Sequence, residues 1–369
     1  AALLCAALAA PGRAGLVAPG RGEAHRRWYD GISSIKVLWP GDENQALVDR
    51  IYQEQKDEQF TERRYAILLK SGVYPLSFNI TVGYYTSVIG VASQAEHVRL
   101  SAVQSHNGAD GHAINNFWRS LEGVALWSPS VTWASSQASP VRRSIIERDL
   151  YLSEGAGFSS GGFLADVQVM RTLDLGSQQQ FIFRNTDVHG NLSCPAGWNY
   201  VFVGSSVAKR MLAGCQGRIP GKVYEAQHTP RIAEKPFLVH DERHDSWSMY
   251  VPGYEERGRG AGRPALTGHG ARELDLERDV FIAKPFLSAV EINRGMEDKK
   301  GVLFTPGVYR LDEPIRIVRD EFVVLGIGFP TLIATTASPA LEVTSGLSDV
   351  RVAGLLIEAG WRRGAPVAD

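Results

Sequence analysis

The most constraining feature of the sequence is a repeat on the scale of a whole domain. Residues 66–76 and 301–311 share one pattern, with Gly72-Val73-Tyr74 in the first copy and Gly307-Val308-Tyr309 in the second. The copies lie roughly 235 residues apart, whereas one coil of a solenoid has about 20–45 residues, so the repeated unit is a domain. A Gly at this turn suits a positive φ. The sequence therefore predicts two similar domains in tandem.

Between the two copies the apolar residues form short, strand-length runs. Gly, Asn, Asp or Ser separates these runs, and the intervals vary in length, which favours a parallel β-helix with irregular corners over a propeller with equal blades. The clearest runs are Tyr65 to Lys70, Ser87 to Val91, Gly123 to Trp127, Arg143 to Glu147, Phe163 to Val169, Gln180 to Arg184 and Tyr200 to Val203. One segment, Glu43 to Gln59, has helical apolar spacing. We expect it to cap the first β-helix, because an open solenoid end exposes core and strand edge.

These patterns predict an all-β chain with four segments. Residues 1–25 are a partial signal peptide and leader, and residues 26–240 are the first β-helix with its capping helix. Residues 241–279 are a linker, because they are rich in charge and Gly. Residues 280–369 are the start of a second β-helix, which the sequence leaves truncated.

The first ten residues and the cysteines bear on the localisation of the protein. Residues 1–10 are small and apolar and precede Pro11, as in the back half of a secretory signal peptide, although a short buried helix or a gene-modelling artefact would look the same. We therefore expect a secreted, extracellular protein. Cys194 and Cys215 could pair in an oxidising compartment, but the sequence leaves their pairing open.

Composition narrows the class of partner. The chain has 39 basic and 40 acidic residues, so it lacks the basic excess of a nucleic-acid or polybasic membrane-binding protein. No stretch reaches the ~20 apolar residues of a membrane span, and Cys194 and Cys215 have no companion Cys or His at metal-ligand spacing. We expect a monomer that acts on a neutral polymer without metal or cofactor.

Several longer motifs resemble glycoside hydrolase family 55. They follow the family's order and spacing from about Ala46 to Gly360. The blocks are Asn116 to Glu122, Ser159 to Asp166, Gly176 to Gln180, Arg184-Asn185 and Trp198 to Gly204. The resemblance implies two tandem right-handed β-helices of the pectate-lyase type with the active site between them. It also implies inverting hydrolysis of β-1,3-glucan, largely from the non-reducing end.

The resemblance places the water-holding residues of such an enzyme at Gln178 and Gln180, assisted by Ser205, with Ser206 as an equal alternative. If the strand includes both glutamines, they project to one face, where amide groups can orient a water without adding charge. The alternative is structural, because stacked Gln and Asn residues in neighbouring coils also form amide ladders.

The substrate-binding candidates are Trp198, Asn199 and Arg184. Trp198 could stack on a sugar face, although a buried corner is the commoner place for such a residue. By resemblance, the general-acid Glu lies in later coils of the second β-helix, beyond residue 369. The resemblance also implies a second Glu in those coils, which polarises the water. Glu342 and Glu358 match neither of these two glutamates, so we expect the chain alone to be inactive.

Two other functions remain open at this stage. A non-catalytic glucan-binding or cell-wall protein would keep the groove without the acid. A polysaccharide lyase is less favoured, because the balanced charge and the lack of a cation-binding cluster suit a neutral substrate better than a uronate.

Overall fold

The computed structural model describes residues 27–41, 44–262 and 266–360. The chain divides into two compact units, 1–31 and 32–369. In the first unit only residues 27–31 are described, and there the backbone N–H of Arg27 donates to the Asp30 carboxylate over 2.9 Å. The predicted leader 1–25, Cys5 and Glu43 lie outside the described residues.

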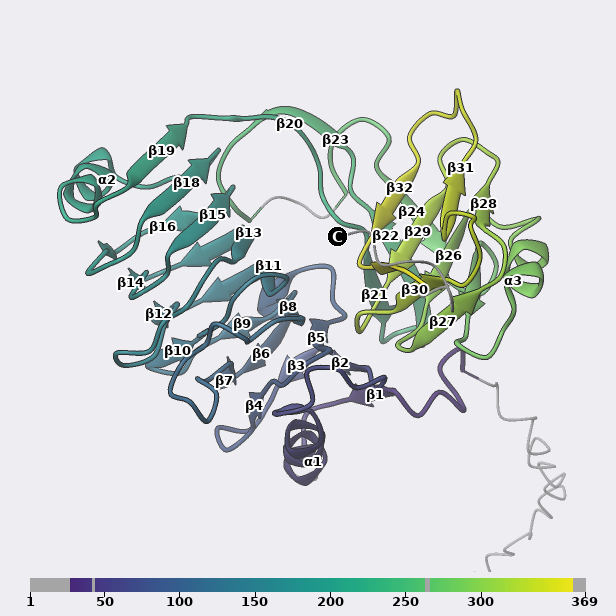
Figure 1. The fold of residues 1–369 in the computed structure, drawn as a ribbon, viewed down its shortest axis with the longest axis horizontal. Coiled ribbons are helices and arrows are strands. Elements are labelled where there is room, and N and C mark those ends of the chain that lie inside the picture. Colours follow the sequence, from purple (N-terminus) through teal and green to yellow (C-terminus); the bar gives the residue numbers. More distant parts are fainter. Residues whose placement is uncertain (1–26, 42–43, 263–265, 361–369) are drawn as a thin grey trace, which may run out of the picture. The chain divides into compact units, whose positions relative to one another are not determined.

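The larger unit begins with a parallel β-helix, as predicted (Figure 1). Its main sheet stacks one strand from each coil, because each strand is apolar on the side that faces the solenoid interior. In order across the sheet the strands are β1 (Ile35–Leu38), β2 (Tyr65–Leu69), β5 (Thr86–Gly90), β8 (Arg119–Glu122), β11 (Pro140–Ile146), β13 (Phe163–Val169), β15 (Gln180–Arg184), β18 (Asn199–Val203) and β19 (Lys222–Ala226).

Shorter strands complete each coil and are also parallel. Those joined to the main sheet are β3 (Gly72–Val73), β6 (Val98–Leu100), β9 (Ala125–Leu126) and β16 (Asp187–Val188). Two further sheets contain β4 (Asn79–Thr81) with β7 (Ala102–Gln104), and β10 (Ser130–Thr132), β12 (Asp149–Tyr151), β14 (Thr172–Asp174) and β17 (Asn191–Ser193). A 3₁₀ turn, η2 (Ala95–His97), precedes β6.

Side chains of successive coils stack along the interior. Phe183 lies over Phe202 with ring centroids 4.4 Å apart and the planes within 10° of parallel. Phe181 packs beside Phe183 at 4.8 Å. This stacking gives a continuous apolar core from coil to coil, which a single coil could not form alone.

Helices close both ends of this core. The predicted cap is α1 (Gln45–Gln55), which buries Val48 and Ile51. At the far end, α2 (Lys209–Gln216) buries Leu212 and is tied to the preceding coil by a disulfide between Cys194 and Cys215, whose Cα atoms are 5.2 Å apart. Within the described residues, no helix has the length and apolar character needed to cross a membrane.

Residues 229–275 contain antiparallel strands, which begin within the segment predicted as the first β-helix and continue through the segment predicted as a linker. They are β20 (Thr229–Ala233) paired with β23 (Tyr254–Gly258), and β21 (Phe237–Asp241), β22 (Ser246–Val251) and β24 (Arg272–Asp275) in one sheet. Trp247, Met249 and Val251 alternate along β22 and are buried, so this charged region has a core of its own.

A second set of parallel coils follows. It contains β25 (Val280–Ala283), α3 (Ala289–Gly295), β26 (Gly301–Phe304), β27 (Val308–Leu311), β28 (Ile315–Ile317), β29 (Val323–Gly326), β30 (Thr331–Ala334), β31 (Leu341–Val343), β32 (Arg351–Ala353) and β33 (Leu356–Ala359). Buried Arg64 of the first solenoid joins it, donating from Nη2 to Thr331 Oγ1 over 3.1 Å and from Nε to the Phe329 carbonyl over 3.2 Å. Ser34 Oγ donates to the Pro306 carbonyl over 3.1 Å.

The repeated Gly-Val-Tyr motif performs the same task in both solenoids. A Cβ on Gly72 would lie 2.5 Å from Pro40 Cγ, and one on Gly307 would lie 2.1 Å from Pro285 Cγ, so only glycine fits under the preceding coil. The buried hydroxyl of Tyr74 donates to the carbonyl of Leu38 in that coil, and that of Tyr309 donates to Ala283. In both solenoids the motif therefore packs one coil against the preceding coil.

We predict that replacing Cys194 and Cys215 with Ser lowers the free energy of unfolding by about 3 kcal/mol, because the bridge closes a short loop in the unfolded chain. Urea unfolding in the absence of reductant measures the loss. Dithiothreitol should lower the stability of the parent by a similar amount and leave the double variant unchanged. A reductant effect on the double variant would contradict the assignment.

Candidate functional site

The outer face of β15, β18 and β19 carries two rows of exposed side chains. Because these strands are parallel and in register, Gln180, Asn199 and Lys222 form one row across the sheet. Two residues further along, Ile182, Val201 and Tyr224 form a second row, in which Ile182 is 46% and Tyr224 is 56% exposed. A polar row, in which Lys222 is the one charged residue, and an apolar row thus lie side by side.

Three of the residues predicted from the sequence lie on this face, and a fourth, Trp198, lies in the bend just before β18. Gln180 and Asn199 are direct register partners. Trp198 precedes Asn199 and is 53% exposed, so it does not occupy a buried corner. Arg184 lies on the same face as Gln180, further along β15. We call Gln180, Arg184, Trp198 and Asn199 the sheet-face site.

Gln178 and Gln180 do not share a face. The strand begins at Gln180, and Gln178 lies in the preceding turn, where its side chain is buried. Its Nε2 donates to the carbonyls of Ser135 and Leu152 over 2.9 and 2.8 Å, so both N–H groups bind backbone of earlier coils. The expected alternation therefore fails because it requires a strand through both glutamines.

Ser205 and Ser206 also lie in different environments. Ser205 is buried, and its Oγ donates to the Phe183 carbonyl over 3.2 Å while it accepts from the Thr186 backbone N–H. Ser206 is exposed and forms a parallel bridge with Asp187. Of the two alternatives, Ser206 is the one open to solvent.

A buried ionic cluster holds the segment after β20 against the main sheet. Lys235 Nζ lies 2.9 and 2.8 Å from the two carboxylate oxygens of Glu122. Glu234 Oε2 accepts from Arg184 Nη2 over 2.6 Å, and Arg142 Nη1 lies 3.8 Å from the same oxygen. We call these five residues the ionic cluster. The sequence gives no local signal for it, since Glu122 and Lys235 are 113 residues apart.

Burial and the neighbouring charges shift the pKa values of Glu122 and Lys235. Burial alone would raise the pKa of Glu122, but Lys235, Arg143 and Arg142 hold this pKa below its usual value. Burial lowers the pKa of Lys235, against the attraction of Glu122. The guanidinium groups of Arg142 and Arg184 also lie over the Phe163 ring, at 4.9 and 5.1 Å from its centroid. Glu122 is thus ionised at neutral pH and cannot donate a proton.

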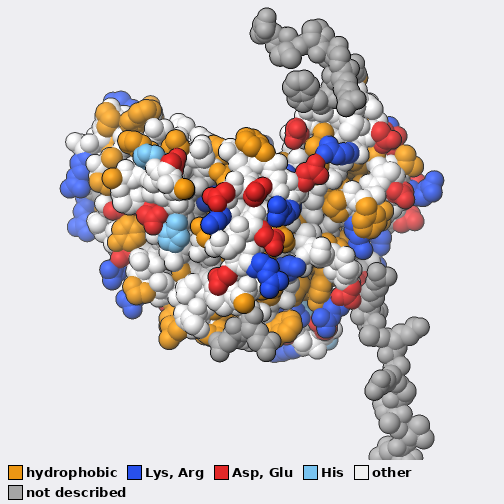
Figure 2. All heavy atoms as spheres, turned by 60° about the horizontal axis from the view of Figure 1, so that its bottom comes forward, with side chains coloured by type: hydrophobic (Ala, Val, Ile, Leu, Met, Phe, Trp, Pro, Cys, Tyr) orange, Lys and Arg blue, Asp and Glu red, His pale blue; other side chains and the backbone are white. Residues whose placement is uncertain are grey.

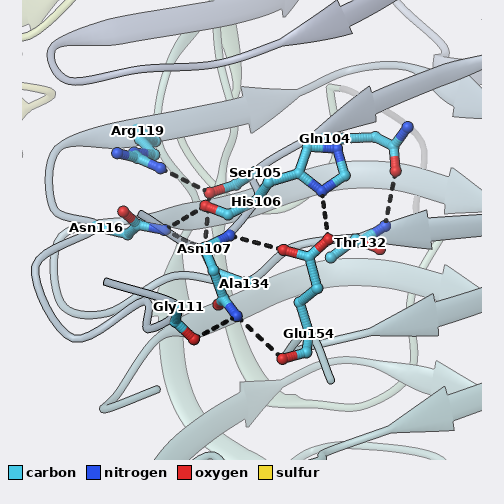
Figure 3. A network of polar contacts seen from close by, with 10 residues as sticks. All are labelled: Gln104, Ser105, His106, Asn107, Gly111, Asn116, Arg119, Thr132, Ala134 and Glu154. Carbon is cyan, nitrogen blue, oxygen red and sulfur yellow. Dashed lines mark hydrogen bonds and ion pairs between the residues drawn. The ribbon is translucent and has the colours of Figure 1, made fainter. Parts of the chain in front are cut away.

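The loops that follow β7 and β12 form a separate polar network (Figure 3). His106 Nδ1 lies 2.9 Å from Glu154 Oε1, and the backbone N–H of Asn107 donates to Glu154 Oε2 over 2.8 Å. Burial would raise the pKa of Glu154, but these two partners hold it below its usual value. Asn116 Nδ2 donates to the His106 carbonyl over 2.7 Å, so the network fixes backbone rather than presenting a free acid.

A cavity of about 200 Å³ lies where the two solenoids meet. The first solenoid contributes Ser120, Glu122 and Arg142, and the second contributes Phe329 and Leu356. On the face shown in Figure 2, acidic and basic side chains are interspersed. Among the described residues, no group of three or more His, Cys, Asp or Glu residues could hold a metal ion.

We predict that Lys235→Met destabilises the fold by about 3–5 kcal/mol, because it leaves the Glu122 carboxylate buried without its partner. Lys56→Met is the matched control, since Lys56 is an exposed partner of Asp57 and should change stability by about 0.5 kcal/mol or less. Urea unfolding of both variants at pH 7 measures the difference. Equal stability of the two variants would show that the cluster does not hold the segment.

We predict a pH dependence from Glu122. Its folded pKa is below the unfolded value of about 4.3, so its stabilising effect is present above that pH and is lost as the pH falls through the folded pKa. The difference in unfolding free energy between the parent and Glu122→Gln should therefore shrink below about pH 4. Urea titrations from pH 7 to pH 3 measure it, and a constant difference would contradict the assignment.

Comparisons with known proteins agree with the fold. Residues 280–367 match the family described as the LAM55 pectate lyase-like domain. An exo-β-1,3-glucanase of Streptomyces sp. (strain SirexAA-E / ActE) is 34% identical over 326 residues, which make up 86% of this chain and 51% of that protein. The structure of sacteLam55A from Streptomyces sp. SirexAA-E matches with a TM-score of 0.77 and 32% identity, covering 89% of this chain and 60% of that one.

A variant of sacteLam55A in complex with glucose matches with the same TM-score, identity and coverage. The chain thus spans about half the length of the curated relative that it matches. The predicted resemblance to glycoside hydrolase family 55 is confirmed, and residues 280–367 are similar to the LAM55 pectate lyase-like domain.

Proposed function

We propose that this protein is a glycosidase that acts on β-1,3-glucan, and that the chain supplies the face on which the glucan lies. The observation that carries the proposal is the sheet-face site with its two rows. Gln180 and Asn199 offer uncharged donors and acceptors for sugar hydroxyls. Ile182, Tyr224 and Trp198 offer apolar surface to the C–H face of a ring. The 34% identity to an exo-β-1,3-glucanase supports the same substrate class.

The proposed reaction is inverting hydrolysis. It needs a protonated acid at the leaving oxygen and a water on the opposite face of the sugar, at a carboxyl separation of ~6.5–9.5 Å. Gln180 can orient that water through its exposed amide. Gln178, with both N–H groups bound to backbone, would act indirectly by fixing the turn that starts β15. Ser205 would fix the next coil in the same way.

The carboxylates beside the face do not fit the acid role. Glu122 is held as an anion by Lys235, and Oε2 of Glu234 already binds Arg184. The proposed acid is therefore neither of these two carboxyls. The same observation favours glucan binding without hydrolysis as the second candidate function.

Laminarin separates the two candidates. Glucose release is measured with the 369-residue chain and with the protein extended through any continuation of its reading frame. Release of α-glucose, detected by proton NMR within seconds of mixing, supports inverting hydrolysis of the β-linkage. Laminarin binding by both forms without glucose release would replace hydrolysis with binding.

We predict that Trp198→Ala weakens binding of laminaripentaose about two- to tenfold, the range expected for losing one aromatic stacking contact. Trp39→Ala is the matched control, because Trp39 is 61% exposed but follows β1 at the other end of the solenoid. Calorimetry measures both variants. Equal affinity of the two variants would remove Trp198 from the site.

A further inference from the structure

An acceptor sequence for N-linked glycosylation lies at the start of β17. The chain contains two Asn-x-Ser/Thr sequences without proline in the middle, Asn79-Ile80-Thr81 and Asn191-Leu192-Ser193. Such a sequence accepts N-linked oligosaccharides in proteins that pass through the secretory pathway, and it belongs on the surface. The sequence does not distinguish the two candidates, whereas their surroundings in the fold do.

Asn191 is open to solvent. It is the first residue of β17, directly after the bend at Gly190, and it is exposed. Its carboxamide makes no hydrogen bond within the described part of the chain. β17 is also the last strand of its sheet, which does not include the strands of the sheet-face site. A glycan on Asn191 can therefore extend into water without displacing protein.

Asn79 is more restricted. It is half-buried on β4 beside the capping helix α1, where Gln45 accepts from its backbone N–H over 2.9 Å and donates to its carbonyl over 2.8 Å. Its side-chain Nδ2, the atom that would carry a glycan, donates to the Ser77 carbonyl over 3.2 Å. A glycan here would compete with an existing contact in the folded protein, so the fold favours Asn191.

The disulfide beside the site indicates the compartment. Cys194 directly follows Ser193 and pairs with Cys215. Disulfides form and persist in oxidising compartments, among them the lumen of the endoplasmic reticulum, where N-linked glycans are transferred. A chain that forms this bridge during secretion from a eukaryotic cell thus passes the transferase.

The fold also restricts when a glycan can be added. The backbone N–H of Asn191 donates to the Arg171 carbonyl over 2.6 Å, the Ser193 carbonyl accepts from the Leu175 N–H over 2.9 Å, and Leu192 is buried. The tripeptide cannot enter the cleft of another enzyme unless this coil opens. The second cysteine lies 21 residues after the first, so the ribosome completes the tripeptide before the bridge can close.

We propose that Asn191 is an N-glycosylation site, modified on the nascent chain before Cys194 and Cys215 pair. Asn191 Nδ2 forms a bond to the anomeric carbon of an oligosaccharide, and the bond from that carbon to the diphosphate of its polyisoprenyl carrier breaks. The bonding electrons leave with the lipid diphosphate, and Nδ2 loses one proton to solvent. The modification is independent of glucan hydrolysis.

Secretion of the 369-residue chain from insect cells, behind a signal sequence of the host, tests the proposal. Peptide-N-glycosidase should increase the electrophoretic mobility of the secreted protein and convert Asn191 to Asp, which peptide mass spectrometry detects. Ser193→Ala should abolish this conversion, because it removes the hydroxyl that completes the acceptor sequence. Ser193→Thr should retain it, since threonine completes the sequence equally.

Asn79→Gln is the matched control, because it removes the other acceptor sequence and should leave the glycan on Asn191 in place. Cys215→Ser, analysed in total cell protein, should also keep the glycan, because transfer precedes the bridge.

Three results would overturn the proposal. They are an unmodified Asn191 in the secreted parent chain, conversion of Asn191 that persists in Ser193→Ala, and loss of the glycan in Cys215→Ser. Because none of these readouts uses a glucan, failure here leaves the proposed hydrolysis untouched.

Discussion

The ionic cluster determines how the chain leaves the first solenoid. After β19 the chain returns across the coils it has already built, and Glu234 and Lys235 bind Arg184, Arg142 and Glu122 on the way. A buried carboxylate and a buried ammonium are each costly alone, so the backbone can follow this path only when both are paired. The pairing therefore fixes the returning segment, and with it the start of the strands that lead to the second solenoid.

The same pairing shapes the sheet-face site. Two carboxylates bind three cations beside the sheet, and the residues left exposed on β15 and β18 are mostly uncharged or apolar. A neutral polysaccharide offers hydroxyl groups and C–H faces, so it complements such a surface without desolvating a charge.

Local sequence patterns predicted the parts of this fold that depend on residues close together in the chain. The Gly-Val-Tyr repeat predicted two similar units, because stacking one coil on the next demands a glycine and a buried tyrosine at a fixed place. The resemblance, not strand alternation, placed Gln180 and Asn199 among the site candidates, and both are exposed at the start of their strands. Alternation misplaced Gln178, since the sequence does not show that the strand begins two residues later.

The remainder depends on contacts between distant residues. Glu122 and Lys235 are separated by 113 positions, and nothing near either one indicates a partner. Arg143 at a left-handed corner was also hidden, because arginine is not a turn residue and only the stacking of neighbouring coils reveals the position. In β22 the alternation of Trp247, Met249 and Val251 was a usable signal, but the surrounding charge and glycine favoured a linker.

The central claim is that a neutral glucan lies across β15 and β18, between Trp198 and the ionic cluster. A crystal structure of the protein with a laminari-oligosaccharide tests it most directly. The account predicts sugar density over Gln180 and Asn199, with one ring stacked on Trp198. Density confined to another face of the solenoid, with this face empty, would contradict it.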